Sequence, residues 1–128
     1  MIAVDTNIIV RIFIDDLNTL QVKAARNLVR KVKQVYLTHV VIVEMVWVLM
    51  RAYQLPKPNI VNILHEICEN AAFVVDDKTV LLDALTLFKN NTVEFSDCMI
   101  LATAKLANVE RIYTFDAKFA CLEGVERL

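Results

Sequence analysis

The sequence contains little glycine and proline: one Gly (Gly124) and two Pro (Pro56 and Pro58) in 128 residues. Because these residue types mark turns and loops, their scarcity excludes a chain built mainly of long irregular loops. The three cysteines form no Cys-x-x-Cys pair, and an odd number cannot close completely into intramolecular disulfides. A reducing cytoplasm is therefore the expected compartment.

Long hydrophobic runs and an excess of one charge are also missing. The longest apolar stretch, residues 40–50, contains Glu44 and is shorter than the roughly 20 residues that cross a bilayer. The N-terminus lacks the basic region of a signal peptide, so we expect a soluble protein. The formal net charge of −1 argues against tight, nonspecific binding of nucleic acid and leaves transient binding through a local basic rim open.

What the sequence does contain is apolar residues, at 57% of the chain against 23% charged. A length of 128 residues predicts a single domain over residues 1–128. The apolar share exceeds that of an average globular domain. We therefore expect one face to be buried against a partner or a second copy of the chain.

Short β-branched runs alternate with longer helical stretches, which predicts an α/β fold with a central, mainly parallel sheet of four or five strands. Thr38, Asp77 and Ser96 are predicted helix caps, and the helix after Thr38 is apolar nearly all round, which predicts a central position. The predicted strands are 2–4, 35–37, 72–75 and 111–115, with 125–128 as a candidate edge strand. The predicted helices are 7–13, 19–33, 40–53, 58–69, 77–88 and 96–107.

Four acidic residues stand out because their sequence neighbours are apolar: Asp5, Glu44, Asp97 and Asp116. Asp5 and Asp116 follow predicted strands, where active sites of open parallel sheets lie. An ionised carboxylate in apolar surroundings is costly unless it is paired or bound to a metal ion. Oxygen ligands suit Mg²⁺ or Mn²⁺, whereas zinc prefers His and Cys. A bound metal could activate water against a phosphodiester.

Each acid also has a purely structural interpretation. Asp5 could cap the following helix, Asp97 could be an acid favoured by a helix N-terminus, and Asp116 could be a turn residue. Glu44 could form an ion pair with Arg11 or Arg51. The joint placement of the four acids at strand ends and on helices favours the metal site.

The sequence around these acids resembles the PIN-domain family, and especially the VapC-type toxins of prokaryotic toxin–antitoxin pairs. The resemblance covers nearly the whole chain in four segments that appear in order. They are Val4-Asp5-Thr6-Asn7 with Arg11, residues 43–49 around Glu44, residues 95–102 around Asp97, and residues 113–119 around Asp116.

The resemblance implies a PIN-like α/β/α sandwich and a metal-dependent endoribonuclease. In that family pattern Asp5 and Asp97 bind Mg²⁺ or Mn²⁺, while Glu44 and Asp116 complete the acidic pocket. The implied supporting polar residues are Thr6, Asn7 and Thr114. The implied partners are an RNA substrate, a cognate antitoxin protein and a second copy of the chain in a homodimer.

Two positions depart from the family pattern. Gln54 and Asn108 stand where glycine is frequent, after the Glu44 helix and before the last long strand. Asn tolerates the left-handed conformation of a helix end nearly as well as glycine, and all four acids are present. The departures therefore leave the predicted site intact.

Three alternatives stay open. A receiver domain of two-component signalling shares the length and an acidic pocket, but it would need paired acids after the first strand, where this chain has Asp5-Thr6. A PIN-like scaffold could bind partners without cutting them. A stand-alone PIN-type nuclease could process RNA or cut DNA without being a toxin.

Overall fold

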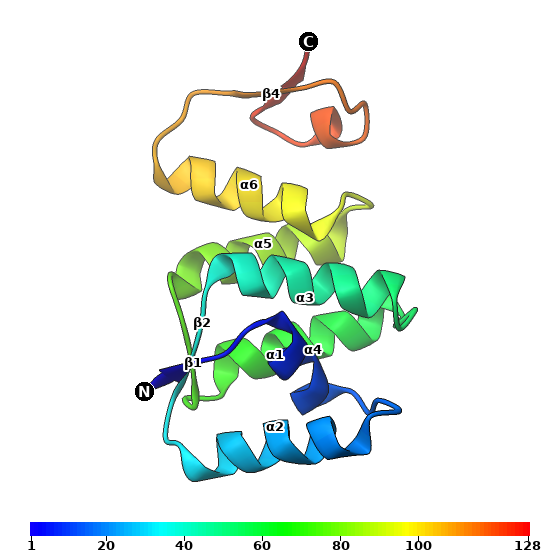
Figure 1. The fold of residues 1–128 in the computed structure, drawn as a ribbon. Coiled ribbons are helices and arrows are strands. Elements are labelled where there is room, and N and C mark those ends of the chain that lie inside the picture. Colours follow the sequence, from blue (N-terminus) through cyan, green and yellow to red (C-terminus); the bar gives the residue numbers. More distant parts are fainter. The chain divides into compact units, whose positions relative to one another are not determined.

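Helices and short strands alternate along the computed structural model, which describes residues 1–128 (Figure 1). The strands are β1 (Ile2–Ala3), β2 (Val35–Leu37), β3 (Phe73–Val75), β4 (Ile112–Thr114) and β5 (Val125–Arg127). The helices are α1 (Thr6–Phe13), α2 (Thr19–Lys31), α3 (His39–Arg51), α4 (Lys57–Glu69), α5 (Lys78–Asn90) and α6 (Phe95–Leu106). The predicted α/β class is confirmed. None of the helices has the length and hydrophobicity needed to span a bilayer.

The chain divides into two compact units, Met1–Asp76 and Asp77–Leu128, here called the N-terminal and C-terminal units. The N-terminal unit contains a parallel sheet in the order β1-β2-β3. Two helices connect each neighbouring pair of strands, because parallel neighbours must be joined by a crossover that returns the chain to the same edge. The carboxyl ends of all three strands therefore lie at one edge of this sheet.

Helix α3 buries one stripe and exposes the other. Ile42, Met45 and Leu49 are fully buried at the spacing of one helix face, whereas Val40 is 66% and Trp47 59% exposed. The helix is apolar nearly all round, as its sequence shows, but one stripe of it is exposed rather than covered. An apolar side chain is buried only where another helix or strand packs against it. In this helix only the residues on one face, spaced by the 3.6-residue period, have such a neighbour.

The C-terminal unit consists of α5 packed against α6 and a two-stranded parallel sheet of β4 and β5. Phe88 and Phe95 meet edge to face with ring centroids 5.5 Å apart. A short 3₁₀ helix, η1 (Phe119–Cys121), lies in the connection between the strands, and the candidate edge strand is present as β5. The five strands thus form a three-stranded and a two-stranded sheet, both parallel.

Two of the three predicted helix caps are confirmed. The side chains of Thr38 and Asp77 accept hydrogen bonds from backbone N–H groups three residues later, at 3.1 and 3.0 Å. The prediction for Ser96 was wrong, because α6 begins at Phe95 with Glu94 at the cap position. Phe95 is almost fully buried, and its packing sets the start of the helix ahead of the serine.

Gln54 and Asn108 adopt left-handed backbone conformations, with φ of 51° and 58°. These are the two positions at which glycine is frequent in the family that the sequence resembles. Asn accepts this conformation through local hydrogen bonding, whereas a Gln side chain carries the full steric penalty of its Cβ.

We expect Gln54→Gly to raise the free energy of unfolding by about 0.5 to 1 kcal/mol, because the relief of backbone strain exceeds the extra entropy of the unfolded glycine. Thermal or urea unfolding measures the change. Asn108→Gly is the matched comparison and should gain less. A loss of stability in Gln54→Gly would contradict the strain argument.

Candidate metal and nuclease site

The N-terminal unit contains two of the predicted site acids, Asp5 and Glu44, and a threonine that bonds to the second. Asp5 follows β1 and caps α1, where its Oδ1 accepts a hydrogen bond from the Ile8 N–H at 3.2 Å. The next residue, Thr6, donates its hydroxyl to Oε2 of Glu44 at 2.8 Å. This bond ties the first residue of α1 to the middle of α3. The bond therefore anchors Glu44 to the first turn of α1, the helix that Asp5 caps.

The other two predicted acids lie together in the C-terminal unit. Asp97 stands in the first turn of α6, and Asp116 follows β4. Partial burial of Asp97 is the main cause that raises the pKa of its carboxyl group, and the charges of Asp116 and Glu94 raise that pKa further. Asp97 and Asp116 therefore interact electrostatically within the C-terminal unit.

The loop after β4 fixes Asp116 through two local hydrogen bonds. The Asp116 N–H donates to the hydroxyl oxygen of Thr114 at 3.0 Å, and its Oδ1 accepts from the Lys118 N–H at 2.9 Å. These bonds are typical of turns that begin with Asp or Thr. Thr114 therefore orients the backbone of Asp116.

None of the four acids is paired with a cation inside the chain. Glu44 accepts a hydrogen bond from Thr6, and Arg11 forms an ion pair with Asp16, with Nη2 3.6 Å from Oδ2. The alternative of a structural Glu44–Arg11 bridge is therefore excluded. Both oxygens of Asp97 make no hydrogen bond within the chain, and one oxygen remains open on each of the other three acids.

The expectation that these acids are desolvated was wrong in part. No charged side chain is buried: Asp97 is half-buried, and Asp5, Glu44 and Asp116 are exposed. For Glu44 the reason is the open stripe of α3, which the composition of that helix concealed. For Asp97 the need for a counter-charge arises first from partial burial and then from the neighbouring acids Asp116 and Glu94.

The donor set fits a hard divalent cation. It offers carboxylate oxygens that have no protein partner, which suits Mg²⁺ or Mn²⁺ better than a metal that prefers nitrogen or sulfur. Neither unit by itself brings together three or more His, Cys, Asp or Glu side chains in a metal-binding group. Each unit instead supplies a pair, Asp5 with Glu44 and Asp97 with Asp116.

Three further residues of the N-terminal unit were not singled out from the sequence as site residues. Asp76 follows β3 and accepts a hydrogen bond from the His39 N–H at 3.1 Å, which anchors the start of α3. Its position directly after a predicted strand was the available signal. Arg11 and Gln21 line a pocket beside Asp5, and only the packing of α1 on α2 brings Gln21 there.

Comparison with known proteins identifies one family. Residues 2–124 match the family model described as PIN domain, so the match extends over both units. No curated protein matches the chain significantly. The family match excludes the alternative of a receiver domain. It agrees with the fold class expected from the sequence.

The raised pKa of Asp97 predicts a pH-dependent effect of removing its charge. The carboxyl group is harder to ionise in the folded than in the unfolded chain, so the penalty is absent at acidic pH and complete above the folded-state pKa. We expect Asp97→Asn to raise the unfolding midpoint of the metal-free protein at pH 7 but not at pH 3.

Urea unfolding in the presence of EDTA measures this effect, with Asp83→Asn on the exposed face of α5 as the matched control. The stabilisation should shrink in high salt, because salt screens the repulsion from Asp116 and Glu94. An Asp97→Asn protein that is less stable than the parent at pH 7 would contradict the assignment.

Proposed function

We propose that this chain, which belongs to the PIN domain family, is a metal-dependent endoribonuclease that works as a single domain over residues 1–128. PIN domains are typically nucleases, and family membership therefore supports hydrolysis of a nucleic acid in general. The choice of RNA and the need for a metal are the finer parts of the proposal. They rest on the resemblance to VapC-type toxins and on the chemistry of the acids.

The observation that carries the proposal is the set of four acids without internal counter-charge. Asp5, Glu44, Asp97 and Asp116 each keep at least one oxygen without a protein hydrogen bond. An isolated protein gains nothing from acids that raise the pKa of a neighbour. A bound cation converts the same repulsion into binding free energy.

In the proposed arrangement Asp5 and Asp97 bind Mg²⁺ or Mn²⁺, and Glu44 and Asp116 complete the acidic set. When bound, the metal would lower the pKa of a water molecule and offset charge on the phosphodiester. The cap bond from Ile8 to Asp5 fixes one Asp5 oxygen and leaves the other for the metal. Asn7 is the remaining supporting residue, in the first turn of α1.

Glu44 and Asp116 are suited to hold or accept protons near the reacting phosphate. Glu44 uses one oxygen to accept from Thr6 and leaves the other open, and Asp116 uses one oxygen to accept from the Lys118 N–H. A carboxylate restrained in this way can orient a water molecule, or accept its proton, through the free oxygen.

We further propose that the enzyme is the toxin of a type II toxin–antitoxin pair, forms a homodimer, and acts in the cytoplasm until its antitoxin binds it. The exposed Val40 and Trp47 on α3 are compatible with a covered face. The alternative is a stand-alone PIN-type nuclease in RNA processing. A neighbouring gene for a small DNA-binding protein would favour the toxin.

The central test is cleavage of structured RNAs by the purified chain in Mg²⁺ or Mn²⁺. We expect activity that EDTA abolishes and that falls at least about 100-fold in Asp5→Asn and in Asp97→Asn. Asp83→Asn, which changes an exposed aspartate on α5, should retain full activity.

Each other outcome has a definite meaning. Cleavage that survives both substitutions would point to a contaminating ribonuclease. Metal binding without cleavage of any RNA, together with no growth arrest on expression in cells, would favour a PIN-like binding module and reject the nuclease.

Thr6 offers a sharper test of how Glu44 is positioned. Thr6→Val removes the hydroxyl that bonds to Glu44 at nearly constant side-chain shape, whereas Thr6→Ser keeps it. We expect Thr6→Val to raise the metal concentration for half-maximal cleavage about tenfold and Thr6→Ser to stay near the parent value. Equal metal requirements in the two variants would remove Thr6 from the site.

A further inference from the structure

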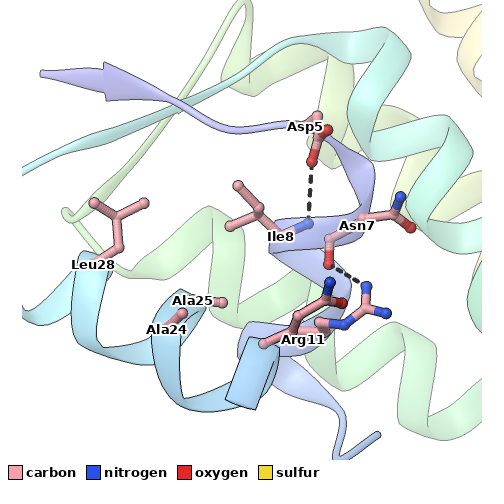
Figure 2. Close-up of a pocket in the computed structure, with 8 residues that line it drawn as sticks. Asp5, Asn7, Ile8, Arg11, Ala24, Ala25 and Leu28 are labelled. Atoms are coloured by element: carbon pink, nitrogen blue, oxygen red, sulfur yellow. Dashed lines mark hydrogen bonds between the residues drawn. The ribbon is translucent and has the colours of Figure 1, made fainter. Parts of the chain in front are cut away.

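The N-terminal unit contains a pocket of about 350 Å³ between α1 and α2, beside Asp5. Figure 2 shows Ile8 and Arg11 on α1 facing Ala24, Ala25 and Leu28 on α2. The space exists because α2 presents two alanines to α1 at this point. Ala25 is buried beneath the pocket, while Ala24 is exposed at its mouth.

The pocket has an apolar part and a polar part. Ile8, Ala25 and Leu28 supply apolar surface, and Gln21 supplies a side-chain amide that makes no hydrogen bond within the chain. An amide of this kind offers both a donor and an acceptor to a ligand. Nε of Arg11 is a buried donor that also lacks a partner.

The charges around the pocket do not favour a phosphate. Arg11 is the one cation in the lining. It already donates from Nη1 to the Asn7 carbonyl oxygen at 3.1 Å and lies 3.6 Å from the Asp16 carboxylate. The Asp5 carboxylate adds negative charge to the same lining. A neutral ligand with apolar faces and a hydrogen-bonding edge fits better.

We propose that this pocket binds a single unstacked nucleobase of the RNA and that Gln21 reads the edge of that base. The proposal rests on the proposed function, in which Asp5 binds the metal and the bound base therefore belongs to a nucleotide next to the cleaved phosphodiester. Proteins that read single-stranded RNA bind bases in this manner, with contacts to the face and hydrogen bonds to the edge.

The size of the pocket favours a single base over a docked peptide helix as its ligand. Small-molecule sites occupy about 300 to 1,000 Å³, and this pocket lies at the lower end. A peptide helix needs a groove with several apolar anchor points along its length. The walls here offer one apolar patch, formed by Ile8, Ala25 and Leu28, which is enough for one ring.

The direct test is a titration of the isotope-labelled, metal-free chain with adenosine, guanosine, cytidine and uridine, followed by NMR. Nucleosides carry no phosphate, so the titration is independent of metal binding and cleavage. We expect one nucleoside to shift the amide signals of Ile8, Gln21 and Ala24 in a saturable manner and more strongly than the other three. No saturable shift with any nucleoside, or shifts confined to other residues, would overturn the proposal.

Two substitutions on α2 probe the pocket. Ala24→Leu places a larger side chain at its exposed mouth, and Gln21→Ala removes the reading amide. We expect Ala24→Leu to weaken nucleoside binding about tenfold and Gln21→Ala to abolish the preference among the four bases. Gln34→Ala changes an exposed glutamine outside the pocket and is the matched control, expected to behave as the parent. Urea unfolding verifies that each variant remains folded.

An RNA arm distinguishes failure of this proposal from failure of the nuclease. Cleavage sites mapped on a randomised RNA should show a base preference that Gln21→Ala relaxes and Gln34→Ala retains. Nucleoside binding without cleavage would leave the base site standing and reject the catalytic proposal. Cleavage with unchanged preference in Gln21→Ala and no nucleoside binding would reject the base site, and loss of antitoxin binding alone in Ala24→Leu would assign the pocket to a protein partner.

Discussion

Four acids that have no internal cation are the constraint on which the proposed site depends. Within the C-terminal unit, partial burial raises the pKa of Asp97, and the charges of Asp116 and Glu94 raise it further. A fold under selection for stability alone would remove such a group or pair it. The cost is understandable if the acids exist to bind a cation that is not part of the polypeptide, since that cation reverses the sign of the interaction.

In both units, a threonine next to an aspartate at the end of a strand forms a hydrogen bond that orients one of the acids. In the N-terminal unit Thr6 follows Asp5 and donates to Glu44. In the C-terminal unit Thr114 precedes Asp116 and accepts from its N–H. A hydroxyl can donate or accept without adding charge. It can therefore orient a carboxylate or its backbone and leave the negative charge available.

The sequence predicted the order and type of the elements because apolar periodicity and capping residues are local signals. Thr38 and Asp77 cap their helices as expected, whereas the start of α6 depended on the burial of Phe95, a tertiary effect. The choice of site acids came from their apolar neighbours and the family resemblance. The exposure of Glu44 could not be predicted from its apolar neighbours, because it depends on which face of α3 the rest of the unit covers.

Asp16 explains how the N-terminal unit can carry Arg11 so close to Asp5 without neutralising it. The Asn18 N–H and the Tyr53 hydroxyl donate to Asp16, and together with Arg11 they lower the pKa of its carboxyl group despite the opposing effect of burial. Asp16 therefore stays ionised and holds the guanidinium. The guanidinium in the pocket lining is thus held by Asp16, and Asp5 keeps one oxygen open. Hydrogen bonds to Asp16, beyond the C-terminal end of α1, therefore bear on the charge in the pocket that Asp5 lines at the N-terminal end.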